Sequence, residues 1–163
     1  MTVLDLPLTA PPRAGSLAAA LQVTGHLGSL LLLAVADPAE RRARDLTPDR
    51  PVDRPVDRPV DRPVDRPVDL ATARAALRRE SRVQDWVGQH EGQLVVVLAV
   101  LPADLDAVAD RMLAVVERTT GRTAAAGLCR VDPDRPVAEH LRWARSGLAV
   151  AWACGGSRVV RHP

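Results

Sequence analysis

Two long apolar runs constrain the fold of this chain more than any other feature. The first, GSLLLLAVAD, covers Gly28–Asp37 and is bounded by glycine and by an Asp-Pro pair. The second, QLVVVLAVL, covers Gln93–Leu101 and follows a polar turn that contains glycine. Neither run alternates between apolar and polar residues, and both are too short to span a bilayer. We therefore expect two strands buried on both faces, with residues 30–36 and 94–101 as central neighbours in one sheet.

The rest of the chain alternates helix-like and strand-like patterns around these runs. Apolar residues recur at helical spacing in four segments, and two weaker strand patterns occur near the C-terminus. This order predicts an α+β or α-β sandwich, in which helices flank a central sheet of about five strands. The residues expected to face the sheet are Leu113, Val116, Leu141 and Leu148. The helical segments are residues 15–21, 70–86, 102–121 and 136–156, and the weaker strands are residues 123–131 and 157–162.

A proline-rich repeat interrupts this pattern. Residues 49–68 are five tandem copies of the tetrapeptide DRPV. Proline at every fourth position is incompatible with a regular helix or a central strand. We expect residues 46–69 to be a disordered, low-complexity loop inserted in a single domain of residues 1–163. The repeat is either an expanded sequence tolerated at the surface or a docking ligand. Shortening it should change stability by less than about 1 kcal/mol, because loop closure depends weakly on length.

Composition argues against several classes of protein. The net charge is only +2, and the 22 basic residues, all Arg, are interleaved with acids rather than gathered in a stripe. With 2% aromatic residues, the chain is not expected to bind nucleic acid. The two cysteines suit a reducing compartment, and no segment resembles a signal peptide or a membrane span. We expect a cytoplasmic protein, and the absence of Lys indicates a GC-rich, actinobacterial genome.

Five partial motifs, in order, resemble the GGDEF, or diguanylate cyclase, domain. The stretch ARSGLAVAWACGGSRV (Ala144–Val159) resembles the family's C-terminal pattern A-D-x-A-L-Y-x-A-K-x-x-G-R-N-x-V without a gap. DLPLTAPPRAGSL (Asp5–Leu17) resembles its opening D-x-L-T-G-L-x-N-R, with slips in spacing. The first strand, the hairpin and the following helix resemble those of the family in the same order. The resemblance covers nearly the whole chain outside the repeat, and it implies the family's sheet flanked by helices.

The resemblance also implies that the family's chemistry is lost. A diguanylate cyclase joins two GTP molecules with the help of divalent metal, which carboxylates of a D-x-D pair and of the signature hairpin hold. These acidic positions fall here on Ala34, Ala36, Gly92 and Gln93, and the family's phosphate-contacting Lys and Arg fall on Trp152 and Gly156. We therefore expect a degenerate domain with no catalytic residue, no metal site and no cofactor. Mg²⁺ is implied only if the chain is an active cyclase.

A few polar residues near these positions have two interpretations. Asp37 is one residue out of register with the D-x-D pair, so its side chain would point to the other face of the strand. His90 and Glu91 are adjacent on a tight turn, where side chains point apart, so we interpret them as an exposed pair rather than as metal ligands. Asp69 is either a remnant of the family's nucleotide-contacting segment or simply the end of the repeat.

A separate regulatory site of the family has a counterpart in this chain. Its R-x-x-D motif matches RVQD, with Arg82 and Asp85, and its supporting Arg matches Arg111. By resemblance, these three residues would bind the product, cyclic di-GMP. Arg presents a planar fork to phosphate or to a guanine edge, and Asp accepts hydrogen bonds from guanine N–H groups. The alternative is a plain salt pair at a helix end.

Four further residues are expected to be structural. Trp143 and Trp152 have the spacing of packing residues on an amphipathic helix. Trp86 is expected at the end of the helix that begins at Leu70. His140 lies near Arg142 on a helix, and we expect it at the surface.

Three functions remain open. The favoured hypothesis is a catalytically inactive GGDEF-like domain that acts in bacterial signalling by binding either cyclic di-GMP or an unknown protein partner that supplies its input. The first alternative is an active diguanylate cyclase with displaced catalytic residues. The second is a structural α/β interaction module without a nucleotide ligand.

Overall fold

The structure, a computed structural model, describes residues 15–36, 68–101 and 103–162. Its elements alternate along the chain as the sequence pattern predicts. The helices are α1 (Leu17–Thr24), the short 3-10 helix η1 (Gly25–Leu27), α3 (Leu70–Glu80), α4 (Leu105–Thr120) and α5 (Val137–Ala153). The strands are β1 (Ser29–Val35), β2 (Trp86–His90), β3 (Gln93–Leu98), β4 (Ala124–Arg130) and β5 (Val159–Arg161).

The five strands form one mixed sheet in the order β2-β3-β1-β4-β5. Strand β1 lies at the centre and is antiparallel to both neighbours, with Leu31 paired to Val96 on β3 and to Leu128 on β4. Strand β5 joins β4 in parallel after the α5 crossover. The two apolar runs are therefore central neighbours, and the predicted α-β sandwich with a five-stranded sheet is confirmed.

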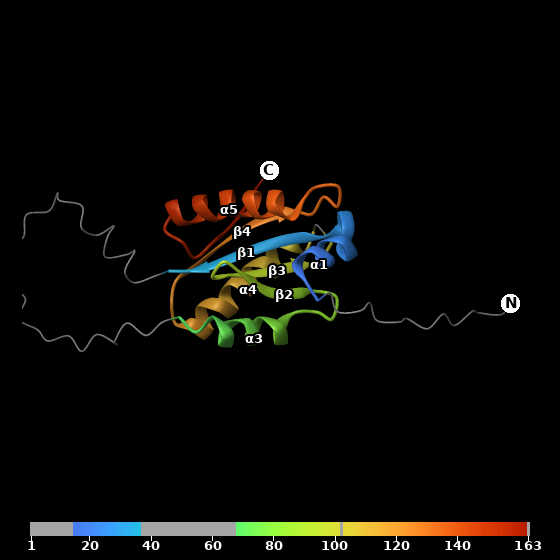
Figure 1. The fold of residues 1–163 in the computed structure, drawn as a ribbon. Helices are drawn as coiled ribbons and strands as arrows, with labels where there is room; N and C mark the ends of the chain where they lie inside the picture. Colours follow the sequence, from blue (N-terminus) through green and yellow to red (C-terminus); the bar gives the residue numbers. More distant parts are fainter. Residues whose placement is uncertain (1–14, 37–67, 102, 163) are drawn as a thin grey trace, which may run out of the picture.

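Helices cover both faces of the sheet, as Figure 1 shows. Alternate residues of each central strand enter different cores, because side chains in a strand point to opposite faces in turn. Leu31 and Leu33 pack with α3 and α4, whereas Leu30 and Leu32 pack with α1 and α5. This division explains why the apolar runs are continuous. The four helical residues predicted to face the sheet, Leu113, Val116, Leu141 and Leu148, are all buried in these two cores.

Helix α5 approaches the sheet most closely where two glycines meet. A Cβ on Gly127 of β4 would lie 1.8 Å from the carbonyl oxygen of Ala144, which is backbone and cannot rotate away. A Cβ on Gly147 of α5 would lie 2.5 Å from the carbonyl oxygen of Val160. The missing side chains thus let α5 lie directly on β4 and β5.

One expectation about helix length is wrong. Helix α3 ends at Glu80 rather than at Trp86, which instead begins β2. The hydroxyl of Ser81 donates to the carbonyl of Leu77 at 2.7 Å, and the side chain of Asp85 organises the turn that follows. Most of the repeat loop, through residue 67, lies outside the described residues, as does Asp37. Within the described ranges, no helix combines the length and apolar character that a bilayer crossing requires.

Candidate functional site

The end of β1 and the β2–β3 turn form one edge of the sheet. Leu33 pairs with Leu94 at the start of β3, so the last residues of β1 lie beside the hairpin turn. Glu91 and Gly92 form that turn with positive φ values of 46° and 75°, the backbone that two-residue hairpins require. The resemblance implies metal carboxylates at this edge, which we call the hairpin edge.

Side chains at the hairpin edge do not fit a divalent metal. Ala34 and Ala36 offer no ligand, and Gln93 offers an amide oxygen that is buried without a hydrogen-bond partner. Glu91 is the remaining carboxylate of the turn, and Arg145 of α5 forms an ion pair with it. In the described part of the chain, no cluster of three or more His, Cys, Asp or Glu residues could hold a metal ion. Hard divalent cations need several oxygen ligands, and the described side chains of this edge do not supply them.

His90 and Glu91 lie closer together than the turn geometry led us to expect. The Nε2 atom of His90 is 3.7 Å from a carboxylate oxygen of Glu91, so the prediction that the two side chains point apart is wrong. Both side chains are largely exposed, at 40% and 66%. Arg145 and His90 thus both lie beside the Glu91 carboxylate, and Arg145 supplies it with a cation from the protein itself.

The two positions that match the family's phosphate cations by resemblance, Trp152 and Gly156, pack against apolar groups in this structure. Trp152 packs partly buried against the core beneath α5. Gly156 is buried in a left-handed conformation with φ 79°, and a Cβ there would lie 2.9 Å from the Trp152 ring. Neither position carries a cationic side chain. Trp143 also packs against this core, as predicted, and its ring stacks on His162.

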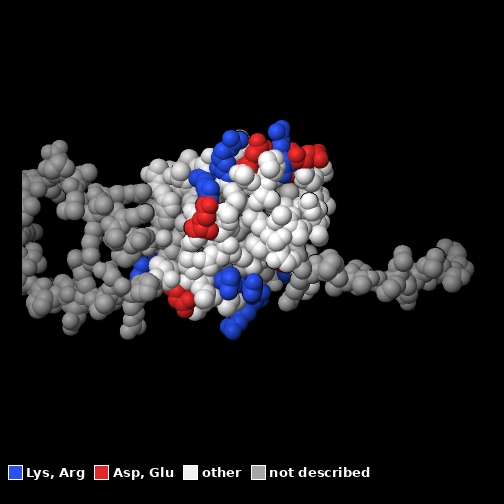
Figure 2. All heavy atoms as spheres, in the orientation of Figure 1, with Lys and Arg blue, Asp and Glu red and all other residues white. Residues whose placement is uncertain are grey.

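A groove runs along the outer edge of β2. It has a volume of about 570 Å³ and lies between α1 on one side and α3 on the other. Three arginines of the α3 side line it, at intervals of four residues: Arg74, Arg78 and Arg82. Figure 2 shows Arg side chains gathered over α3, whereas acids and arginines are mixed over α5. We call this feature the arginine groove.

Asp85 lines the arginine groove, but both oxygens of its carboxylate accept hydrogen bonds from backbone N–H groups. One oxygen accepts a hydrogen bond from the N–H of Arg82 at 2.9 Å, and the other accepts from the N–H of Ala99 at 3.0 Å. These bonds join the turn to the end of β3. Asp85 therefore fixes the backbone that carries Arg82, while the exposed Arg82 guanidinium makes no ion pair with any described residue.

The structure brings two of the three predicted ligand residues together. Arg82 and Asp85 both line the arginine groove, whereas Arg111 is exposed on α4 and is not among the lining residues. Sequence reasoning missed Arg74 and Arg78. Their i, i+4 spacing with Arg82 was the available signal, but the abundance of Arg in this chain concealed it.

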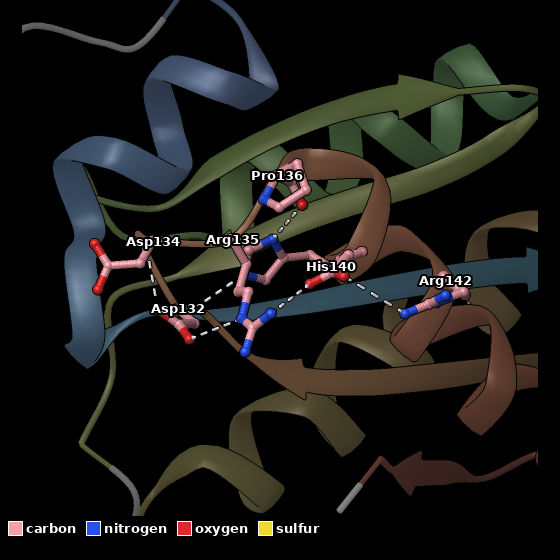
Figure 3. A network of polar contacts seen from close by, with 7 residues as sticks. Asp132, Asp134, Arg135, Pro136, His140 and Arg142 are labelled. Carbon is pink, nitrogen blue, oxygen red and sulfur yellow. Dashed lines mark hydrogen bonds and ion pairs between the residues drawn. The ribbon is translucent and has the colours of Figure 1, made fainter.

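His140 is not at the surface, contrary to expectation. It is 1% exposed and sits in a polar network at the start of α5 (Figure 3). Its Nε2 atom accepts a hydrogen bond from the N–H of Asp132 at 2.9 Å, so Nδ1 carries the proton and donates to the carbonyl of Pro136 at 3.1 Å. Because both ring nitrogens have backbone partners, His140 is structural and is not available for chemistry.

Solved structures share this fold, although no protein-family model and no curated protein matches the chain. A microbial GGDEF domain described with cyclic di-GMP aligns over 87% of this chain and 88% of that one, with a TM-score of 0.58 and 18% identity. The GGDEF domain of YfiN from Pseudomonas aeruginosa aligns over 92% of both chains, with a TM-score of 0.56 and 16% identity. Identities this low show the fold alone, which is therefore GGDEF-like.

A third match was solved with a protein partner. The diguanylate cyclase SiaD from Pseudomonas aeruginosa, in complex with its activator SiaC, has a TM-score of 0.57 and 19% identity. That alignment covers 82% of this chain but 49% of SiaD.

Proposed function

We propose that this chain is a catalytically inactive, GGDEF-like regulatory domain that binds cyclic di-GMP in the arginine groove. The observation that carries the proposal is the contrast between two places along β2. At the hairpin edge, the single carboxylate of the turn is paired with Arg145. In the groove, two of the three arginines have no ion pair or hydrogen bond from their side chains to the described residues.

Catalysis would require charge stabilisation that the hairpin edge does not offer. Nucleotidyl transfer from GTP, in which a 3′-hydroxyl attacks the α-phosphate and pyrophosphate leaves, develops negative charge that metal ions and fixed cations must stabilise. The residues that match the family's metal ligands are alanine, glycine and glutamine, and those that match its phosphate cations are Trp152 and Gly156. We therefore propose that no cofactor is used and that GTP is not turned over.

Incubation with GTP and either Mg²⁺ or Mn²⁺ tests the inactivity directly. We expect no cyclic di-GMP by chromatography of the products. Turnover that disappears in Glu91→Ala and persists in Glu80→Ala, an exposed acid on α3, would show that the chain is an active cyclase. Turnover that survives Glu91→Ala would be consistent with a contaminating enzyme and would require repurification before a conclusion.

The ligand proposal rests on charge and shape. Cyclic di-GMP carries two phosphodiester charges and two guanine edges, and arginine can bind either group through paired N–H donors. Arg82 projects from a turn that Asp85 holds in place, and Arg78 and Arg74 extend the positive wall along α3. We retain Arg111 as a supporting cation from α4. Asp85 acts mainly by positioning Arg82, because backbone N–H groups already occupy its two oxygens.

Titration calorimetry with cyclic di-GMP tests this assignment. A charge-assisted hydrogen bond contributes about 1.5–3 kcal/mol, so Arg82→Ala should weaken binding roughly ten- to a hundredfold. Arg79→Ala is the matched control, because Arg79 is an exposed arginine three residues earlier, on α3, and does not line the groove. Arg111→Ala should have a smaller effect than Arg82→Ala. Binding that is indifferent to Arg82 would refute the site.

We place the protein in the cytoplasm of an actinobacterium, where a partner protein supplies its input. Both cysteines, Cys129 and Cys154, are free thiols, which suits a reducing compartment. The SiaD–SiaC complex is a precedent for protein partners among proteins of this fold. The arginine-only basic composition supports the proposed source.

A further inference from the structure

The outer edge of β2 has no neighbouring strand within the described residues. His90 and Gln93 flank the two-residue turn and pair with each other. Hydrogen-bonded and non-hydrogen-bonded pairs alternate along an antiparallel ladder. Counted from the hydrogen-bonded pair that closes the turn, Gln89 and Val87 fall in non-hydrogen-bonded pairs. Their N–H and C=O groups therefore point away from β3. The Arg78 guanidinium donates to the carbonyl of Val87 at 3.3 Å, which agrees with this direction. The edge is thus a row of backbone donors and acceptors at the floor of the arginine groove.

The two walls of this groove differ in chemistry. The wall on the α3 side carries Arg74 and Arg78 on the helix and Arg82 on the turn that follows it. The α1 wall is mostly apolar and includes Ala20 and Val23, which is 61% exposed. On the α1 side, the Trp86 indole forms the floor of the groove and lies across Gly88. A Cβ on Gly88 would be 2.1 Å from the indole ring.

The spacing of the arginine wall matches the spacing of a strand. Residues four apart on a helix are about 6 Å apart along its axis, since each residue rises about 1.5 Å. Residues two apart on a strand are about 6.7 Å apart and point to the same face. Arg74 and Arg78, which both lie on α3, can therefore meet two side chains that are two residues apart on a strand laid along β2. The intervening side chains would face the α1 wall and the Trp86 ring.

We infer that the outer edge of β2 is a docking site for an extended, acidic segment of a partner protein, which adds to the sheet as a further strand. The segment alternates acidic side chains toward α3 with apolar side chains toward α1. Its backbone N–H replaces the Arg78 guanidinium at the carbonyl of Val87, which releases that guanidinium to pair with an acid. This mode of recognition uses backbone hydrogen bonds for affinity and alternate side chains for specificity.

Charge selects this occupant over a second copy of the chain. Two copies docked edge to edge would bring two arginine walls to one groove, and like charges in close contact are repulsive. An acidic segment instead neutralises the wall. This inference goes beyond the nucleotide proposal, and its test contains no nucleotide, so the two succeed or fail separately.

The test uses a fluorescein-labelled peptide of about eight residues in which Glu and Val alternate. Fluorescence anisotropy should show binding at least tenfold tighter than that of two matched controls. In the first control, Lys replaces every Glu. In the second, the same Glu and Val residues are arranged in two blocks, which keeps the charge and removes the alternation. Equal binding of the alternating and block peptides would overturn the inference, and so would no binding of either.

Methylation of the peptide backbone separates strand addition from charge attraction. In an added strand, every second N–H faces β2, so N-methylation of one alternate set should abolish binding and that of the other set should not. Equal tolerance of both sets would exclude strand addition. On the protein side, the double variant Arg74→Glu, Arg78→Glu should lose at least tenfold in affinity for the Glu peptide and gain affinity for the Lys peptide. Arg79→Glu should change neither. The peptide comparisons on the unaltered protein remain decisive if the double variant unfolds.

Discussion

His140 illustrates how a single polar side chain becomes part of a core. Its helical position beside Arg142 is typical of a surface residue, yet the chain between Val131 and Pro136 folds back over it. The backbone groups of Asp132 and Pro136 then satisfy both ring nitrogens. The sequence does not specify this loop path, so it could not specify the burial.

Replacing His140 with Ala should destabilise the fold by about 2–4 kcal/mol, because it leaves a cavity and removes the acceptor of the Asp132 N–H. Urea denaturation measures the change. His90→Ala is the control, since that side chain is 40% exposed and substitutions of this kind change stability by about 0.5 kcal/mol or less. Equal effects of the two variants would contradict the assigned role of His140.

The two thiols should differ in reactivity. Burial raises the pKa of the Cys129 thiol to about 12, and its Sγ donates to the carbonyl of His140 at 3.3 Å. Because the thiolate is the reactive form, Cys129 should resist alkylation at pH 8, whereas the exposed Cys154 should react. Mass spectrometry after iodoacetamide treatment should find one modified thiol in the native protein and two after unfolding. Rapid native modification of Cys129 would contradict its burial.

At the scale of elements, the repeat connects to α3 through a helix cap. Asp69, the residue after the last DRPV copy, accepts hydrogen bonds from the N–H groups of Ala71 and Thr72 at 3.0 and 3.1 Å, and from the Thr72 hydroxyl. These bonds, that of the Thr72 hydroxyl foremost, hold the pKa of Asp69 below its ordinary value. Neither earlier interpretation included this role, although an acid before a helical pattern is a recognised start signal.

Asp69→Ala should lower the melting temperature at pH 7, whereas Asp69→Asn, which keeps a capping oxygen, should lower it less. A carboxyl with a lowered folded-state pKa stabilises the fold above its unfolded pKa, and that contribution disappears as pH falls through the folded value. The difference in melting temperature between the native protein and Asp69→Ala should therefore become smaller below about pH 4. A difference in melting temperature that increases as the pH falls would contradict the capping role of Asp69.

The contact of α5 with β4 depends on glycine. Gly127→Ala should lower the free energy of unfolding by about 1–3 kcal/mol or more. The added Cβ would collide with the backbone of Ala144 and force α5 away from the sheet. Gly15→Ala is the matched control, since a Cβ there meets nothing within 4 Å. Thermal unfolding of the two variants makes the comparison. A neutral Gly127→Ala would show that α5 does not lie directly on the sheet.

At the scale of the whole molecule, the two central strands of the sheet could be predicted from the sequence more readily than the groove. Continuous apolar runs can only be buried on both faces, which places β1 and β3 at the centre of a covered sheet. The arginine groove depends on three segments that are distant along the chain, namely α1, α3 and β2. Each contributes ordinary residues, so only their assembly creates the pocket. Arg82 and Asp85 were predicted through resemblance, whereas the role of Asp85 as a backbone acceptor became apparent only from its contacts.

The central claim is that ligands bind along the arginine groove and not at the hairpin edge. Backbone amide NMR spectra of the isotopically labelled protein, recorded with and without cyclic di-GMP, test this most directly. We expect chemical-shift changes to cluster at Arg78–Gln89 and in α1, and we expect GTP with Mg²⁺ to cause none at residues 33–36 or 90–93. Shifts centred on the end of β1 and the hairpin turn, with either nucleotide, would contradict the account.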